Sequence, residues 1–377
     1  MNNNNTTYHP LGDYIRPVDV RNRDLQVTKL LGLSIEKCFI PSIANTIGTD
    51  MSTYKVVMPG QFAYGPVTSR NGDKITIALY TGDEPAIISQ AYVVFEIVDR
   101  EKLLPEYLMM WFRRPEFDRY ARYHSHGSAR EIFDWAEMCA TMVPVPPISE
   151  QRAVVADYEA VARRIAVAKR TIATLQATAQ ALYRKMFVDG IDKENLPEGW
   201  RWGTLGEVAK ITMGQSPSGE TYNEDGKGMI FYQGRTDFGF RFPSIRMYTT
   251  EPTRFAKKGD VLLSVRAPVG DLNIAPHDCC IGRGLASIRE KHNCQSYIYY
   301  LLMSLSDIFN VSDGDGTIFG SITKDELYGI KVIIPTENTI NTFEVKAEII
   351  DKEIKLLDKE INILTELLSM VMAGIGK

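Results

Sequence analysis

Side chains able to recognise nucleic-acid bases recur in turn-like stretches of both halves of this 377-residue chain. Sequence readout of DNA requires groups that make bidentate hydrogen bonds with base edges, chiefly those of Arg, Lys, Asn and Gln, whereas Ser, Thr and backbone amides bind phosphates. The candidates in the first half are Arg21, Arg23, Ser69, Arg70, Asn71, Lys74, His126, Ser128 and Arg130. Those in the second half are Gln215, Ser216, Gln233, Arg235, Arg241, Arg266, Arg283, Thr317 and Lys324.

Two tripeptides in the second half are favoured because a predicted strand delivers each of them to a loop. They are Gln-Gly-Arg at residues 233–235 and Ser-Val-Arg at residues 264–266. Tyr232, Phe238 and Phe240 lie near the first and could stack on a base, although aromatic side chains more commonly pack in a core. Simple solvation at the surface is the alternative for every cation in the set.

The sequence lacks the strings typical of catalytic and cofactor sites. The Pro146-Pro147 pair is not part of the (D/N)PP(Y/F) motif of adenine methyltransferases, and no Walker loop, G-x-S-x-G or H-E-x-x-H occurs. Residues 314–320, GDGTIFG, have the wrong spacing for a phosphate cradle and predict a flexible turn. His124 and His126 have no acid or cysteine at ligand spacing, which favours a surface loop. We therefore expect no catalytic residue, metal or cofactor in this chain.

The composition of the chain excludes further classes of protein. The formal net charge of −4 excludes a generally basic nucleic-acid coat, so local patches or a partner must neutralise phosphates. The sequence contains neither a run of about 18 apolar residues nor an apolar signal core at its start. The five cysteines include no C-x-x-C pair, which indicates reduced thiols and neither a disulfide framework nor a zinc site. We expect a cytoplasmic protein without a membrane partner.

The elements that must position the candidates include two long helices. Apolar or small residues at alternating steps of four and three predict a coiled-coil seam in each. The first seam comprises Val154, Tyr158, Val161, Ile165, Ala168, Ile172, Leu175, Ala179, Leu182 and Met186, and the second comprises Ala347, Ile350, Ile354, Leu357, Ile361, Leu364, Leu368 and Val371. One such stripe alone would favour a bundle helix. Two matched stripes, one basic and one mildly acidic, predict a paired antiparallel spacer of roughly 55 Å.

Each seam follows a globular segment, and the two segments resemble each other. Gly127 and Gly316 are 189 residues apart, and so are Pro146 and Pro335. Equal offsets indicate an internal duplication. We therefore predict an α+β chain with two similar mixed α/β domains, separated by two long antiparallel helices and related by a pseudo-two-fold axis, with one domain at each end of the pair. The predicted boundaries are 1–148 and 200–336 for the domains, 149–188 and 337–377 for the helices, and 189–199 for a linker.

These features resemble the specificity subunits of type I restriction-modification systems. The resemblance rests on LPEGW at residues 196–200 with LGEVAKITMGQSPS at 205–218, on VPVPPISEQ at 143–151, and on the duplication with two helices. Two departures exist. The first domain lacks LPEGW, and PTENTI at residues 335–340 replaces PPxxEQ before the second helix.

The resemblance implies that each domain is a target-recognition domain that reads one half of a split DNA site, with the helices setting the gap. It also implies docking of two DNA-adenine methyltransferase subunits, which would bind S-adenosylmethionine, and of restriction-translocase subunits. Two alternatives remain open: a non-catalytic coiled-coil scaffold, and the specificity subunit of a related methyltransferase-nuclease system. The missing catalytic strings argue against a self-sufficient nucleic-acid enzyme.

Overall fold

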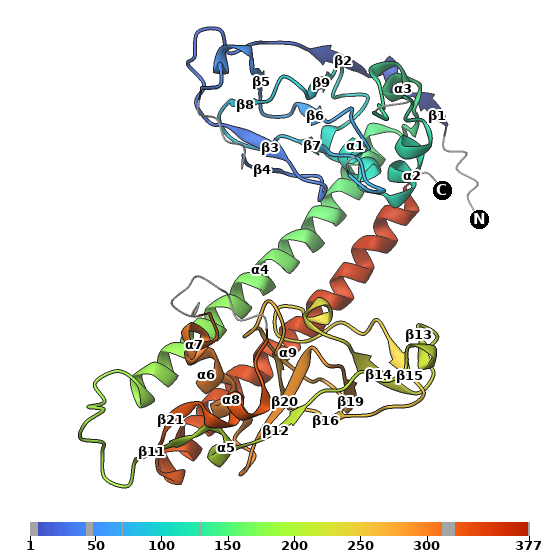
Figure 1. Cartoon of the computed structure of the whole chain (residues 1–377). Helices are drawn as coiled ribbons and strands as arrows, with labels where there is room; N and C mark the ends of the chain where they lie inside the picture. Colours follow the sequence, from blue (N-terminus) through green and yellow to red (C-terminus); the bar gives the residue numbers. More distant parts are fainter. Residues whose placement is uncertain (1–6, 43–47, 70, 128–129, 311–320, 376–377) are drawn as a thin grey trace. The chain divides into compact units, whose positions relative to one another are not determined.

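The computed structural model describes residues 7–42, 48–69, 71–127, 130–310 and 321–375 (Figure 1). Backbone contacts divide the chain into two compact units, Met1–Val167 with Glu360–Lys377, and Ala168–Lys359. Each unit contains one globular domain and a part of each of the two long helices.

The first unit is built on an antiparallel sheet in the order β2 (Ile15–Val18), β9 (Val93–Ile97), β6 (Phe62–Tyr64) and β7 (Ile77–Leu79). Helices α1 (Pro105–Phe112) and α2 (Pro115–Tyr123) both begin with proline, whose fixed φ angle suits the first helical position. Phe62 and Phe95 stack with 4.9 Å between ring centroids, and Phe112 meets Phe62 edge-on at 5.9 Å. α1 therefore packs on this sheet through aromatic contacts.

Shorter elements surround that sheet. The antiparallel pairs are β1 (Tyr8–Pro10) with β10 (Met142–Pro144), β3 (Leu31–Leu33) with β4 (Phe39–Pro41), and β5 (Lys55–Val57) with β8 (Ala86–Ile88). The helical elements are η1 (Leu11–Asp13), η2 (Met51–Thr53) and α3 (Trp135–Ala140). The Asp134 carboxylate accepts a hydrogen bond from the Glu137 amide at 2.9 Å and so caps α3.

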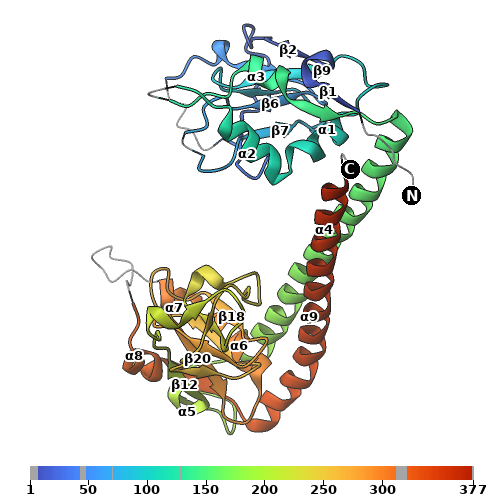
Figure 2. The same ribbon diagram turned by 90° about the vertical axis from the view of Figure 1, so that its right-hand side faces the viewer.

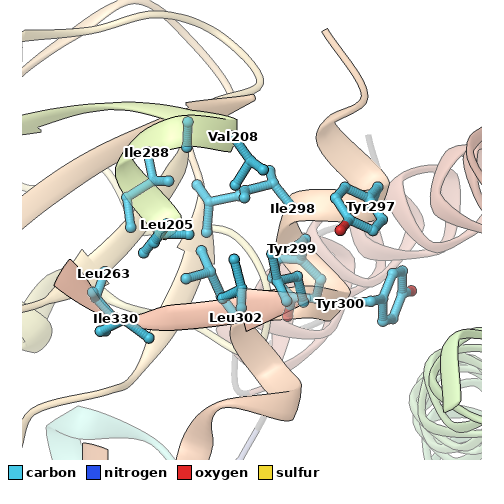
Figure 3. Packing of buried hydrophobic residues seen from close by; sticks show 14 of the residues in the cluster. Leu205, Val208, Leu263, Ile288, Tyr297, Ile298, Tyr299, Tyr300, Leu302 and Ile330 are labelled. Carbon is cyan, nitrogen blue, oxygen red and sulfur yellow. The ribbon is translucent and has the colours of Figure 1, made fainter. Parts of the chain in front are cut away.

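The second unit repeats this plan. Its central antiparallel sheet has the order β12 (Ala209–Met213), β20 (Leu285–Glu290), β17 (Val261–Ser264) and β18 (Leu272–Ile274). Leu263 and Ile288 of this sheet pack with Ile298 and Leu302 of α6 (Gln295–Ser304), and all four are fully buried (Figure 3). Tyr300 of the same helix points away from these aliphatic residues (Figure 3).

The second unit contains two further sheets and several short helices. β11 (Arg201–Thr204) pairs with β21 (Lys331–Ile334), and a five-stranded sheet has the order β13 (Tyr222–Asn223), β15 (Tyr248–Thr249), β14 (Met229–Tyr232), β19 (Cys279–Ile281) and β16 (Phe255–Ala256). The helical elements are α5 (Leu205–Val208), η3 (Gly219–Thr221), η4 (Arg235–Asp237), α7 (Ser306–Asn310) and α8 (Lys324–Gly329). Thr323 and Glu326 form a capping box that starts α8.

The duplication is confirmed at the level of individual hydrogen bonds. In the turn before β6, Gly60 has φ +85° and its amide donates to the Tyr80 carbonyl at 2.8 Å. In the turn before β17, Gly259 has φ +90° and its amide donates to the Ala275 carbonyl at 2.8 Å. Both turns need the left-handed backbone that glycine adopts readily. The two sheets therefore have the same strand order, and the same type of turn precedes the equivalent strands β6 and β17.

The predicted seams face inward on α4 (Ile148–Phe187) and α9 (Glu337–Gly374), since every seam position is buried or half-buried. In the first unit, Arg164 of α4 pairs with Glu360 of α9 at 2.5 Å. In the second unit, Tyr183 of α4 contacts Phe343 of α9. Rising residue numbers in α4 meet falling numbers in α9, so the helices are antiparallel, as predicted, and lie side by side within each unit (Figure 2).

Each domain is also hydrogen-bonded to a long helix at the start of one of its own helices. Gln151 of α4 is fully buried and accepts from the Leu104 amide, just before α1, at 2.9 Å. Glu344 of α9 accepts from the amides of Ser296 and Tyr297 in the first turn of α6, at 3.0 and 2.8 Å. These bonds satisfy amides that have no partner inside their own helix. Burial raises the pKa of Glu344, although the two amides oppose that shift.

Candidate nucleic-acid interface

Three backbone segments of the second unit converge beside its central sheet. They are residues 214–216, 232–235 and 281–284. The Gly214 amide donates to the Leu285 carbonyl at 2.9 Å, and the Gly282 amide donates to the Tyr232 carbonyl at 2.8 Å. The Arg283 amide completes the connection by donating to the Ser216 hydroxyl at 3.2 Å. These bonds fix the three loops against one another.

Two glycines permit this close approach. A Cβ atom on Gly214 would lie 2.2 Å from the Gly282 carbonyl oxygen, and a Cβ atom on Gly282 would lie 2.7 Å from the Gln233 carbonyl oxygen. Real Cβ atoms do not come this close to a backbone oxygen, so any side chain at either position would push the loops apart. The exposed side chains Gln215 and Arg283 directly follow these glycines.

Two more segments join the same group of loops. The Val265 amide donates to the Gly284 carbonyl at 2.9 Å, and the Ile322 amide donates to the Val265 carbonyl at 3.0 Å. Arg266 and Ser321 form an isolated antiparallel bridge next to these bonds. We call these five segments, residues 214–216, 232–235, 265–271, 281–284 and 321–324, the loop cluster. It brings together seven predicted contact residues. Ser216 is half-buried, and six are exposed: Gln215, Gln233, Arg235, Arg266, Arg283 and Lys324.

The charge of the loop cluster is mainly positive. Asp271 forms an ion pair with Arg235, the Nε atom of the arginine donating to the carboxylate. Among the ion pairs of the described residues, none places a carboxylate on Arg266 or Arg283. Side chains of this type can meet phosphate or a guanine edge without first breaking an internal ion pair.

Of the three aromatic residues near residues 233–235, only one presents a free ring. Tyr232 is fully buried, and Phe238 is half-buried against the same core cluster. Phe240 is 59% exposed. Phe240 is therefore the residue of this group that could stack on a base.

Arg241 is a correction to the sequence prediction. Its side chain is 1% exposed and pairs with Asp351 of α9 at 2.5 Å. The cation is also stacked on Tyr299, with 4.2 Å between Cζ and the ring centroid. A guanidinium buried and paired in this way has no surface to offer to DNA. Sequence reasoning could not separate it from its neighbours because a buried arginine and a surface arginine look alike in a loop.

The first unit brings five candidates into a corresponding position. Val67 and His126 both form isolated bridges with Ile132, and the Thr68 amide donates to the Glu131 carbonyl at 3.0 Å. The Val67 bridge occupies the place of the Arg266 bridge in the second unit. The five candidates on the described parts of these two loops are Ser69, Asn71, Lys74, His126 and Arg130.

Several of the first-unit candidates have internal partners. The Asn71 side chain donates to the Val67 carbonyl at 3.2 Å. Lys74 pairs with Glu36 at 2.9 Å, which raises the pKa of Lys74. His126 Nε2 lies 3.8 Å from a Glu137 carboxylate oxygen, and the side chain remains 73% exposed.

Arg21 and Arg23 lie elsewhere in the first unit. Arg21 Nη1 donates to the Thr53 carbonyl at 2.7 Å, and its Nε lies 3.1 Å from Asp19, so this guanidinium is already occupied. Arg23 is exposed. Three other candidates fall outside the described residues: Arg70, Ser128 and Thr317.

Asp237 is a residue of this loop that the sequence analysis did not single out. It is buried, and its Oδ2 accepts from the Gln233 amide at 2.7 Å, while its Oδ1 accepts from Arg246 at 2.9 Å. The signal that could have found the loop cluster is the Gly-Arg-Gly run at residues 282–284, since glycines on both sides of a cation indicate close backbone packing.

The described residues contain no group of three or more His, Cys, Asp or Glu side chains placed to hold a metal ion. Within the same residues, no helix is both long and apolar enough to cross a membrane. The exposed side chains of the loop cluster offer hydrogen-bond donors and positive charge, which suit a polar, anionic ligand.

Comparison with known proteins also points to DNA as the ligand. Residues 197–368 match the family model of the type I restriction modification DNA specificity domain. A Methanocaldococcus jannaschii protein provisionally named the type I restriction enzyme MjaX specificity subunit is 28% identical over 322 residues, covering 81% of this chain and 75% of its own length. The type I restriction enzyme MjaIX specificity subunit of the same organism is 22% identical and covers 66% of this chain and 62% of its own length.

A solved structure shares the fold. The S subunit of a type I restriction-modification system from M. genitalium is 14% identical, with coverage of 99% of this chain and 96% of that one and a TM-score of 0.61. At this identity the likeness concerns the fold alone. In sequence and in its duplicated mixed α/β fold with paired helices, this chain is therefore similar to the specificity subunits of type I restriction-modification systems.

Proposed function

We propose that this chain reads a split DNA site, with one target-recognition domain for each half-site. The observation that carries the proposal is the loop cluster of the second unit. It presents Gln233, Arg266 and Arg283 on one rigid frame, with residue types that bind base edges and phosphates. The corresponding loops of the first unit carry different side chains beside a sheet of the same strand order. Two domains that read different half-sites require such a difference.

The paired helices α4 and α9 would hold the two domains at a set distance. Domains that bind one face of a duplex contact half-sites about 34 to 36 Å apart, or multiples of this. A helix of 40 residues, the length of α4, extends about 60 Å at roughly 1.5 Å per residue, which is long enough for such a spacing.

In this proposal the chain supplies recognition and no catalysis. Two DNA-adenine methyltransferase subunits would dock on the helices and their junctions, and they, not this chain, would bind S-adenosylmethionine. Restriction-translocase subunits would complete the complex in the cytoplasm. The absence of the adenine-methyltransferase motif and of a Walker loop from the sequence supports this division of labour.

Selection from a library of randomised double-stranded DNA by the full chain, co-purified with its methyltransferase subunit, tests the proposal. The expected result is enrichment of two short blocks of fixed sequence separated by a gap of constant length and free composition. A single contiguous block would contradict the two-reader arrangement. No enrichment at all, with the complex intact, would favour the scaffold alternative.

A further inference from the structure

Arg241 connects a loop of the second unit to a long helix through a buried ion pair. The Nη2 atom lies 2.5 Å from Oδ1 of Asp351 on α9. The Nη1 atom donates to the Tyr300 hydroxyl at 3.1 Å, and that hydroxyl donates to Asp351 at 2.9 Å. A cation this deeply buried is stable only while its counter-charge and hydrogen bonds are in place. Asp351 therefore holds the side chain of Arg241 against α9.

The backbone around Arg241 is also tied to the central sheet. The Ile274 amide of β18 donates to the Arg241 carbonyl at 2.8 Å. Two residues earlier, the Gly239 amide donates to Oδ1 of Asn273, and Nδ2 of Asn273 donates back to the Gly239 carbonyl, both at 3.1 Å. The loop is thus fixed between β18 on one side and α9 on the other.

The same loop carries two of the candidate contact residues. Asp237 joins its two arms, since its carboxylate accepts from the Gln233 amide and from Arg246, and its carbonyl accepts from the Ser244 amide at 2.8 Å. These hydrogen bonds join the two ends of the loop. A displacement of Arg241 therefore also moves Gln233 and Arg235, the first residue of η4.

We propose that Arg241 and Asp351 are positioning residues, whose ion pair keeps the loop of residues 233–246 in the position from which Gln233 and Arg235 read DNA. The proposal rests on the DNA-reading function proposed for that loop. Hydrogen bonds to base edges need donor–acceptor distances of about 2.7 to 3.2 Å and a nearly straight donor–hydrogen–acceptor angle, so a shift of the loop costs discrimination. Through Asp351 and this loop, α9 influences sequence specificity although it carries no base-contacting loop itself.

The influence is confined to one half-site. The position 189 residues before Asp351 is Ala162, which has no charge, so the ion pair has no counterpart at the repeated position of α4. A change at Asp351 should therefore alter recognition by the second domain and leave recognition by the first domain as it is.

The anchoring step is tested without DNA, by amide hydrogen exchange on the full chain. Asp351→Asn removes the counter-charge, and Glu353→Gln, an exposed acid two residues along the same helix, is the matched control. The expected result is exchange at residues 233–246 that is faster by roughly tenfold in Asp351→Asn and unchanged in Glu353→Gln. Unchanged exchange in Asp351→Asn would overturn the proposal.

The positioning step is tested by selection from randomised duplex DNA with the same variants. Gln233→Ala identifies which half-site the second domain reads. At that half-site, Asp351→Asn should lower discrimination between the preferred and a substituted base by roughly tenfold, the order of one lost base contact, with the other half-site unchanged. Equal loss at both half-sites, or faster exchange with full discrimination, would overturn the proposal.

Two milder variants keep the test decisive if Asp351→Asn does not fold. Tyr300→Phe removes only the hydroxyl shared by the ion pair, and Asp351→Glu keeps the charge. Both should show smaller losses at the same half-site, and the absence of any loss in Tyr300→Phe would count against the proposal. If Gln233→Ala leaves both half-sites unchanged while exchange in the loop responds to Asp351→Asn, the reading function fails and the anchor stands.

Discussion

Tyr183 of α4 meets Phe343 of α9 edge to face, with 5.7 Å between the ring centroids and 82° between the ring planes. Phe343 is fully buried and also contacts Phe187 at 5.4 Å and Tyr300 at 5.9 Å. One ring therefore joins both long helices to α6. The helix pair in the second unit is held by an aromatic cluster as well as by its aliphatic seam.

Replacing the ring of Phe343 should destabilise the second unit. Phe343→Ala is expected to lower the free energy of unfolding by about 3 to 5 kcal/mol, because it removes a large buried side chain from a site that cannot collapse easily. Ile349→Ala is the control, since Ile349 lies on the same helix and is 67% exposed, and its cost should stay within about 0.5 kcal/mol. Denaturant unfolding of both variants checks the prediction, and equal costs would contradict it.

The glycines of the loop cluster should be intolerant of any side chain. Gly282→Ala places a Cβ atom against the Gln233 carbonyl, so we expect a loss of stability of roughly 1 to 3 kcal/mol and weakened DNA binding. Gly219→Ala is the matched control, because a Cβ there would meet nothing within 4 Å. Thermal unfolding and DNA binding of the two variants should differ; wild-type behaviour of Gly282→Ala would show that the loops are not closely packed.

Glu344 should make stability depend on pH in a definite direction. Burial raises the pKa of Glu344 in the folded chain above its ordinary value of 4.5, so the folded state binds more protons than the unfolded state from about pH 4.5 upward. Stability contributed at this site is present at low pH and is lost as the pH rises through the folded pKa. Denaturant unfolding across this range should show a smaller decline with pH in Glu344→Gln than in the wild type. Parallel pH profiles would exclude the effect.

Insertion of four residues near Thr174 tests the helices as a ruler. Such an insertion lengthens α4 by about 6 Å, close to two base-pair steps of about 3.4 Å. The complex should then tolerate a gap longer by one or two base pairs, or lose binding. A four-residue insertion in residues 189–199, outside the helix, is the control and should leave the gap unchanged. An unchanged gap preference after insertion in α4, measured by methylation footprinting, would rule out the ruler.

The sequence was sufficient to predict the duplication and the helix pair because both leave periodic signals. The alternation of steps at Ala168, Ile172 and Ala179 has one physical cause, burial along one face of a helix, and all three are buried. The equal offset of 189 residues predicted a repeat, and the matched turns at Gly60 and Gly259 follow from it.

The site was less predictable because its geometry depends on contacts between distant segments. Nothing near Gln215 in the sequence shows that it lies beside Gly282, since their neighbourhood depends on backbone hydrogen bonds from strands far apart in the chain. The same limit explains Arg241, whose partner Asp351 is 110 residues away. A residue type can suggest a chemistry, but only tertiary packing decides whether the side chain is exposed.

Mapping of methylated adenines in DNA from cells that carry this chain and its methyltransferase tests the central claim most directly. Two paired variants supply the contrast: Gln233→Ala with Arg266→Ala in the second domain, and His126→Ala with Arg130→Ala in the first. The account predicts a split motif in which the first pair relaxes one half, the second pair relaxes the other half, and the gap stays constant. Relaxation of the same half by both pairs, or of both halves by either pair, would contradict it.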